Sequence, residues 1–309
     1  QAKDERTLAF ILERLLEVGR VLDALSLAAT FRAEVYIESQ FLLRLLGLVP
    51  SSIVKEDPRP DTSMIAYSIK ELFDVLRKRT DVERFEVAKA EYALLPLLTA
   101  PWDIQNLVLH KMLSDDPRFF IDLICDIYKP ASGGQETEID EYKLTKAEYG
   151  YDLLQSWKTI PGTDSQGVIR ESELSKWVTD ARVLAKQKDR ADITDQAIGR
   201  ILAYAPNDPV DGAWPHQAVR NILESTESQH IKIGLTVEIH NKRGVVKKEV
   251  FEGGKQEQVL ASQWREWADI VKPQWPFTGS ILVDIAEDWE QLAKKEDVRA
   301  DQDRIRFRG

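Results

Sequence analysis

Hydrophobic residues recur at helical spacing along most of the chain. Near its start, five apolar residues fall at positions i, i+3, i+4, i+7 and i+8, which form one face of a helix: Leu8, Ile11, Leu12, Leu15 and Leu16. A similar stripe runs through residues 256–271. An apolar helix face needs a neighbour to cover it, so the pattern predicts helices packed against one another.

Glycine, proline and capping residues predict where these helices end. Gly47 is a suitable C-cap for the helical run that begins near Leu22, and residues 51–63 are predicted to form a proline-broken loop. Pro96 lacks the backbone N–H and is expected to kink or end the helix that it interrupts. Ser114 is the predicted N-cap of the helix that follows it.

The succession of helices and short loops predicts an all-α fold of stacked αα-hairpins, and a HEAT-like array is one arrangement of this kind. We expect residues 1–130 to form a first helical array and residues 139–309 a second helical subdomain, with a loop or linker at 129–138. The apolar stripe of the first helix has no preceding neighbour, so the chain is expected to be a segment of a larger protein. A full-length protein from which a tag has been cleaved is the alternative.

One segment departs from the helical pattern near residues 235–251. Two β-branched stretches, 235–240 and 245–251, flank the sequence NKRG, which ends at Gly244. They predict either a small β-hairpin with Gly244 in its turn, or a helix that Gly244 caps and that a loop follows. We favour the helix, so that the fold contains at most this one hairpin.

The composition is that of a globular protein, with 43% hydrophobic and 30% charged residues among 309. The net charge of −10 argues against a dedicated nucleic-acid binder, because phosphate contacts require a basic surface. No apolar run approaches the roughly 18 to 20 residues that cross a bilayer, so we expect no membrane interaction and a cytoplasmic location. The single cysteine, Cys125, is expected to be a buried free thiol in a reducing compartment.

One loop follows part of the calcium-binding template. In residues 162–173, Gly167 takes the turn position and Glu173 takes position twelve, which requires a bidentate carboxylate. Asp164 takes position three. Position one is Gly162, which offers no carboxylate, so we interpret the segment as a turn that leads into a helix and not as a metal site.

Motifs for catalysis or cofactor binding are absent from the sequence. The four histidines lie on separate predicted elements, without the i, i+4 pairing of a helical zinc site, and the glycine pairs have no phosphate-loop context. We therefore predict no metal, no cofactor and no catalytic residue, and we favour a non-enzymatic function. An enzyme whose carboxylates converge between helices is the alternative.

Two sets of residues are candidates for binding. Four basic residues interleaved with glutamates form either a solvated loop or a site for nucleic acid or an acidic protein patch: Lys242, Arg243, Lys247 and Lys248. Three of the eight tryptophans are candidate anchors for a protein partner, since tryptophan is enriched at interface hot spots: Trp214, Trp264 and Trp267. Packing between helix layers is the alternative for these tryptophans.

Two stretches in the last third of the chain, residues 200–225 and 240–268, also carry a resemblance to a group of proteins. It rests on three short matches: Trp214-Pro215, Asn241 to Gly244, and the sequence GGKQE from Gly253. These stretches resemble the C-terminal helical regions of large uncharacterised bacterial proteins, some of which couple a helical array to an effector or nucleoside-triphosphatase module, as antiviral defence proteins do. The resemblance implies a sensor or scaffold that binds a protein partner or self-associates.

Overall fold

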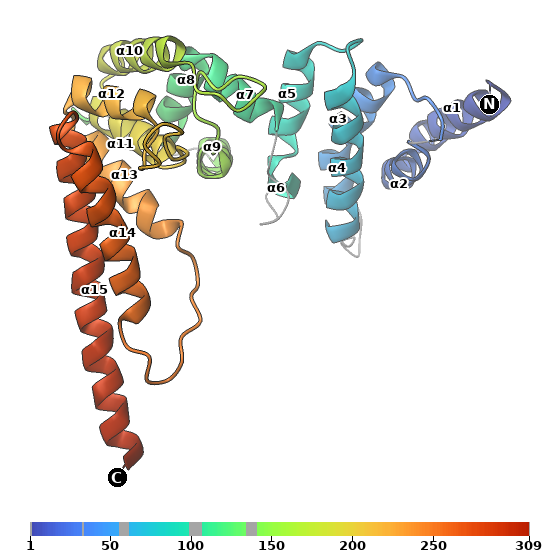
Figure 1. Ribbon diagram of the computed structural model, residues 1–309. Coiled ribbons are helices and arrows are strands. Elements are labelled where there is room, and N and C mark those ends of the chain that lie inside the picture. Colours follow the sequence, from blue (N-terminus) through green and yellow to red (C-terminus); the bar gives the residue numbers. More distant parts are fainter. Residues whose placement is uncertain (1, 33, 56–61, 99–106, 134–140, 309) are drawn as a thin grey trace. The chain divides into compact units, whose positions relative to one another are not determined.

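The computed structural model describes residues 2–32, 34–55, 62–98, 107–133 and 141–308, and almost all of its ordered elements are helices (Figure 1). Within these ranges the chain forms no strand, and its one β-like contact is an isolated antiparallel bridge between Thr163 and Ile169. The prediction of an all-α fold is therefore confirmed. None of the described helices is long and apolar enough to span a membrane.

The chain divides into two compact units. Unit 1 consists of Gln1–Leu113 and Glu138–Trp157, and unit 2 consists of Ser114–Thr137 and Lys158–Gly309. Residues 129–137 of the predicted linker belong to unit 2 and residue 138 to unit 1. Its residues 134–138 lie outside the described ranges. The boundary predicted from the sequence, like the HEAT-like arrangement, stays a prediction.

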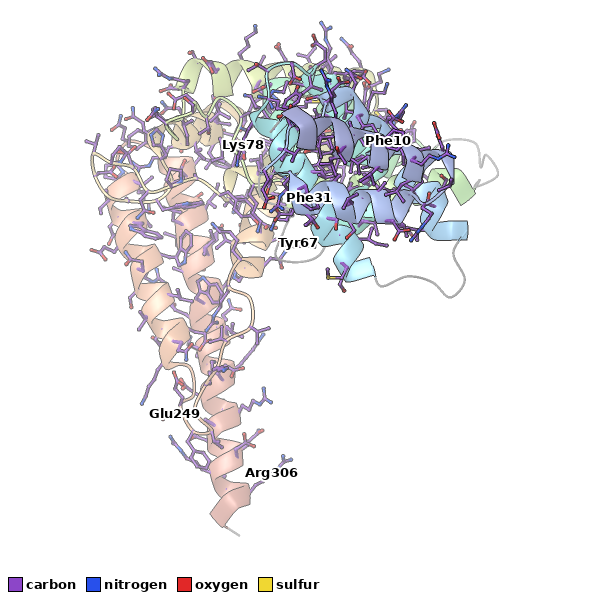
Figure 2. All side chains as sticks on the ribbon, turned by 90° about the vertical axis from the view of Figure 1, so that its right-hand side faces the viewer. Phe10, Phe31, Tyr67, Lys78, Glu249 and Arg306 are labelled. Carbon is purple, nitrogen blue, oxygen red and sulfur yellow. The ribbon has the colours of Figure 1, made fainter. Side chains whose placement is uncertain are left out.

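Within the described ranges, unit 1 contains eight helices in whole or in part. They are α1 (Ala2–Glu17), α2 (Val21–Phe31), α3 (Ser39–Lys55), α4 (Thr62–Lys78), α5 (Arg84–Ala93), α6 (Leu95–Leu98), α7 (Val108–Asp115, whose last two residues belong to unit 2) and α9 (Glu141–Ser156). Helix α2 packs against α1, α3 and α4. Leu8 and Leu12 of the first apolar stripe are buried, whereas Ile11 is 41% exposed beside the exposed Phe10 (Figure 2).

Helix α3 continues past the residue that was expected to end it. Gly47 lies inside α3, and so do residues 51–55, which the sequence pattern assigns to a loop. Leu46 and Val49 are fully buried on either side of the glycine. Burial of this apolar face outweighs the low helix propensity of one glycine, so the predictions of a C-cap at Gly47 and of a loop from residue 51 are wrong. Residues 56–61 lie outside the described ranges.

The start of α8 (Pro117–Ile127) also differs from the prediction. Its N-cap is Asp116 and not Ser114: the Asp116 carboxylate accepts a hydrogen bond from the Arg118 N–H at 2.9 Å. Pro117 occupies the first helical position, which makes the residue before it the cap. The break between α5 and α6 falls at Leu94, two residues before Pro96, which then occupies the first turn of α6, as proline chemistry predicts.

Unit 2 contains α8, α10 (Glu171–Gln187), α11 (Ala191–Leu202), α12 (Gln217–Thr226), α13 (Gln229–Asn241), α14 (Lys255–Val271) and α15 (Pro276–Arg308). Helices α14 and α15 run side by side along most of α14 (Figure 1). Helices α11 and α13 pack closely where Gly199 faces Gly234, and a Cβ on either glycine would lie about 2 Å from the other helix's backbone.

The segment near residues 235–251 is a helix followed by a loop. Helix α13 ends at Asn241, and Gly244 follows with a φ of 63°, a left-handed conformation that glycine adopts readily. Residues 242–254, called the strap below, then run without secondary structure to the start of α14 (Figure 1). The helical interpretation is confirmed and the β-hairpin alternative is wrong.

Candidate functional site

The basic residues of the strap are largely bound to the chain itself. Arg243 forms an ion pair with Glu257 on α14, and Lys248 lies 2.8 Å from the same carboxylate and 3.1 Å from Glu296 on α15. Glu257 is only 1% exposed. These four residues, called the ion network below, carry two positive and two negative charges and tie the strap to both helices.

The ion network stabilises the charged forms of Glu257 and Lys248, the two members whose pKa is shifted. Burial by itself would raise the pKa of the Glu257 carboxyl, but hydrogen bonds from Lys248 and Arg243 hold that pKa below its ordinary value. Burial would likewise lower the pKa of Lys248, but Glu257 and Glu296 raise it above its ordinary value. The network is therefore a set of mutually satisfied charges and not an open cationic surface.

The other two predicted basic residues differ in their contacts. Lys242 donates a hydrogen bond to the Ala203 carbonyl at 2.8 Å, and its Nζ lies 4.9 Å from the centre of the Tyr204 ring. Burial lowers the pKa of Lys242. Lys247 is exposed and forms no ion pair with the part of the chain that the structure describes. Lys247 is thus the one of the four basic residues whose side chain has no ion pair or hydrogen bond with the described part of the chain.

A cleft of about 620 Å³ opens between the strap and α15. Apolar side chains from both sides line it: Val246 and Val250 from the strap, and Trp289, Leu292 and Ala300 from α15. Arg299 and Asp303 also line the cleft, and neither has an ion pair among the described residues. Glu249 lines it as well and likewise has no ion pair among the described residues, so the cleft combines an apolar lining with one positive and two negative charges available to a ligand.

The three candidate tryptophans form one aromatic cluster. Trp264 packs edge-on against Trp214 and Trp267, with ring centres 5.1 Å apart in both pairs. Trp214 and Trp264 are 4% and 7% exposed, and the Trp214 indole N–H donates to the Ala205 carbonyl at 2.8 Å. Trp267 is half-buried and is the one of the three that reaches the surface appreciably. This burial is what packing between helix layers requires.

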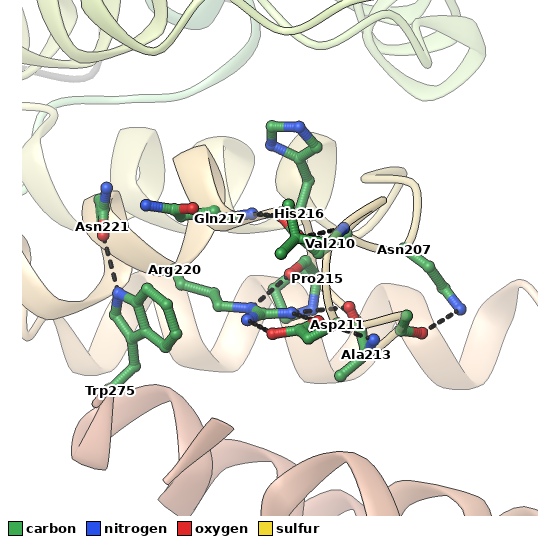
Figure 3. A network of polar contacts seen from close by, with 12 residues as sticks. Asn207, Val210, Asp211, Ala213, Pro215, His216, Gln217, Arg220, Asn221 and Trp275 are labelled. Atoms are coloured by element: carbon green, nitrogen blue, oxygen red, sulfur yellow. Dashed lines mark hydrogen bonds and ion pairs between the residues drawn. The ribbon is translucent and has the colours of Figure 1, made fainter. Parts of the chain in front are cut away.

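A buried arginine, which the sequence analysis overlooked, organises the loop before α12 (Figure 3). Arg220 is fully buried and donates to both carboxylate oxygens of Asp211, to the Pro215 carbonyl at 2.6 Å and to the Ala213 carbonyl at 2.7 Å. Its guanidinium carbon also lies 4.9 Å from the ring centre of Trp275. The available signal was a lone arginine within the apolar face of α12.

The calcium-like loop is a turn held by its own aspartate. Asp164 Oδ1 accepts hydrogen bonds from the N–H groups of Gln166 and Val168, and Oδ2 pairs with Arg170 at 2.8 Å. Hydrogen bonds from Val168 hold the pKa of Asp164 below its ordinary value despite some desolvation. Both carboxylate oxygens are thus engaged by the loop itself. This geometry is what the turn interpretation expects.

Other titratable groups with shifted pKa values serve helix packing. Glu91 is fully buried, and burial raises its pKa even though Arg77 lies 2.9 Å away and the Leu109 N–H donates to it. Cys125 is a free cysteine, half-buried and not buried as expected, and desolvation raises its pKa. A raised pKa disfavours the reactive thiolate. Among the described residues no cluster of His, Cys, Asp or Glu is placed to hold a metal ion.

Comparison with known proteins gives no family for the chain. No family model, no curated protein and no solved structure matches it. The resemblance to helical regions of bacterial defence proteins therefore stays a prediction, and the site must be interpreted from its own geometry.

Proposed function

We propose that the chain is a non-enzymatic helical region that binds another protein, and that the cleft between the strap and α15 is where a segment of that protein lies. The observation that carries the proposal is the cleft itself. Its volume of about 620 Å³ suits a few side chains, and its lining mixes apolar groups with the charges of Arg299 and Asp303.

The ion network supports a binding function over catalysis. A general acid in a cleft needs a raised carboxyl pKa, whereas the pKa of the cleft residue Glu257 is lowered by its cationic partners. A carboxylate that two cations hold in the charged form positions the strap well and transfers protons poorly. The same network argues against nucleic acid, since the charges of Arg243 and Lys248 are already neutralised.

Site-specific photocrosslinking tests this proposal in cells. A photoreactive amino acid at Val250, which lines the cleft and is 65% exposed, should crosslink to one discrete protein. The matched position is Val210, which is 88% exposed and lies in the loop before α12. We expect no discrete product there.

A charge reversal then tests whether the crosslink at Val250 reports specific binding in the cleft. Arg299→Glu should abolish the crosslink at Val250, because it reverses a charge that lines the cleft. Arg306→Glu makes the same change seven residues further along α15, outside the residues that line the cleft, and should leave the crosslink intact. Equal crosslinking at Val250 and Val210, or insensitivity to Arg299→Glu, would reject the proposal.

A further inference from the structure

Two lysines lie at one tyrosine ring of unit 2. Lys242 Nζ is 4.9 Å from the ring centre of Tyr204, and Lys158 Nζ is 5.6 Å from the same centre. Tyr204 lies two residues after the end of α11, Lys242 directly follows α13, and Lys158 lies in the loop after α9. Three segments that are far apart in the sequence thus bring two positive charges to one aromatic ring.

The two lysines have no counter-ion at ion-pair distance. Among the described residues, neither Lys158 nor Lys242 forms an ion pair with a carboxylate. Glu238 lies one helical turn before Lys242, but its buried carboxylate accepts a hydrogen bond from the Tyr204 hydroxyl. Two cations therefore face one carboxylate that the tyrosine already engages, and this part of the surface attracts anions.

The surroundings of Lys242 favour its neutral amine. The residue as a whole is exposed, but its nitrogen lies against the Tyr204 ring and donates a hydrogen bond to the Ala203 carbonyl at 2.8 Å. Loss of water around this nitrogen lowers the pKa of Lys242, the charge of Lys158 lowers it further, and together they outweigh the opposite effect of Glu238. A neutral lysine amine is a nucleophile, and desolvation and a neighbouring cation are two ways in which proteins activate it.

We propose that Lys242 is a modification site, acylated on Nζ by small acyl phosphates whose phosphoryl group Lys158 binds. The Lys242 nitrogen attacks the acyl carbon, and a C–N bond forms. The bond between the acyl carbon and the bridging oxygen breaks, and its electron pair leaves with the phosphate, which takes up the proton that the amine loses. The products are an N-acyl lysine and inorganic phosphate. This site does not depend on what occupies the cleft.

The geometry suits an electrophile with a negatively charged end. The two lysine nitrogens cannot be further apart than their 4.9 Å and 5.6 Å distances from the ring centre, taken together. The acyl carbon and the phosphoryl oxygens of an acyl phosphate are a few ångströms apart, so one molecule can present the first to Lys242 and the second to Lys158. The neutral amine still donates to the Ala203 carbonyl, which holds the nitrogen in place and leaves its lone pair free.

Acetyl phosphate provides a direct test. The full chain is incubated with millimolar acetyl phosphate near neutral pH, and mass spectrometry follows the acetylation of each lysine with time. Lys242 should react about fivefold or more faster than Lys247, which is also exposed on the strap but has no ion pair or hydrogen bond with the described part of the chain. Equal rates at Lys242 and Lys247 would overturn the proposal.

Charge variants test the part that Lys158 plays. Lys158→Gln should slow the acetylation of Lys242 by acetyl phosphate about fivefold or more, whereas Lys158→Arg keeps the charge and should retain most of the rate. Lys247→Gln is the matched control, because it removes an exposed lysine elsewhere on the strap and should leave the rate at Lys242 unchanged. Lys158 is exposed as well, so all three variants should fold, and unchanged thermal midpoints check this.

An uncharged acyl donor separates the two effects of Lys158. With N-acetoxysuccinimide, Lys158 acts only through the pKa of Lys242, so Lys158→Gln should slow the reaction less than it does with acetyl phosphate. Added potassium chloride should likewise slow the reaction with acetyl phosphate more, because salt screens the attraction between Lys158 and the phosphoryl group. An equal loss of rate with both donors would overturn the binding of the phosphoryl group by Lys158. A faster reaction of Lys247 than of Lys242 with the uncharged donor would overturn the activated amine.

Discussion

The carboxylate of Asp211 pairs with both terminal nitrogens of Arg220, at 2.5 Å and 2.9 Å, and the arginine has no exposed surface (Figure 3). Asp211 lies in the loop before α12, nine residues ahead of its partner on the helix. The same guanidinium also binds the Ala213 and Pro215 carbonyls. One side chain therefore holds three points of the loop that carries Trp214.

Asp211→Ala should lower the free energy of unfolding of unit 2 by about 3–5 kcal/mol, because it leaves a buried guanidinium without its counter-ion. Urea denaturation followed by tryptophan fluorescence measures this, since six of the eight tryptophans belong to unit 2. Asp301→Ala is the control: Asp301 pairs with Arg304 on the surface, and its loss should change stability by less than about 1 kcal/mol. Equal effects of the two variants would contradict the structural role of Arg220.

The glycines between α11 and α13 should not tolerate a methyl group. A Cβ at Gly234 would lie 1.9 Å from the Gln196 carbonyl oxygen, and one at Gly199 would lie 2.0 Å from the Ile231 carbonyl oxygen. Backbone atoms cannot move aside as a flexible side chain can, so the helices must separate. We expect Gly199→Ala and Gly234→Ala each to destabilise unit 2 by about 2–3 kcal/mol or more.

Gly47→Ala is the matched control for these two variants. It makes the same change inside a helix, but a Cβ there meets no atom within 4 Å. Alanine favours helix over glycine by about 1 kcal/mol, so this variant should raise the stability of unit 1. Chemical denaturation of all three variants gives the comparison, and a stabilised Gly234→Ala would show that α11 and α13 do not pack as described.

Much of the helical fold could be predicted because helix formation depends on local apolar spacing. The helix at 229–241 followed by the left-handed Gly244 is one case, and the break before Pro96 is another. Gly47 could not be assigned correctly, because its propensity is local whereas the burial of Leu46 and Val49 depends on tertiary packing. The tendency of a glycine to end a helix is opposed by the burial of its apolar neighbours. The sequence alone does not show which neighbours are buried.

The candidate site was predictable only as a set of residues and not as an arrangement. Charge clustering marked Lys248 and Arg243, but their shared partner Glu257 follows them by 9 and 14 residues and lies in α14, outside the strap. The pairing depends on how the strap folds back onto α14. The buried role of Arg220 required similar knowledge of tertiary contacts, although its place among apolar neighbours was visible.

The turn around Asp164 should respond to mutation but not to calcium. Asp164→Ala removes two hydrogen bonds to backbone N–H groups and one ion pair, and should lower the stability of unit 2 by about 1–2 kcal/mol. Adding millimolar calcium to the unaltered chain should leave its thermal midpoint unchanged, because both oxygens of this carboxylate are already engaged. A calcium-dependent rise in the midpoint that Asp164→Ala removes would contradict the turn interpretation.

Glu257→Gln should destabilise unit 2 in a pH-dependent way. The pKa of Glu257 is lower in the folded chain than its ordinary value, so its contribution is fully present above the unfolded pKa, about 4.3. That contribution is lost as the pH falls through the folded pKa. The free-energy difference between the unaltered chain and Glu257→Gln should therefore be constant between pH 5 and pH 8, at about 1–3 kcal/mol, and shrink below about pH 4.5.

The raised pKa of Lys248 does not change the free-energy difference between pH 5 and pH 8. It is raised in the folded chain, so the contribution of Lys248 is fully present below its unfolded pKa, about 10.4, and is lost only at higher pH. Urea denaturation of both proteins at several pH values gives the difference. A difference that instead grew as the pH fell from 5 to 3 would mean that Glu257 is protonated more easily in the folded chain, and the ion network would not hold the strap as described.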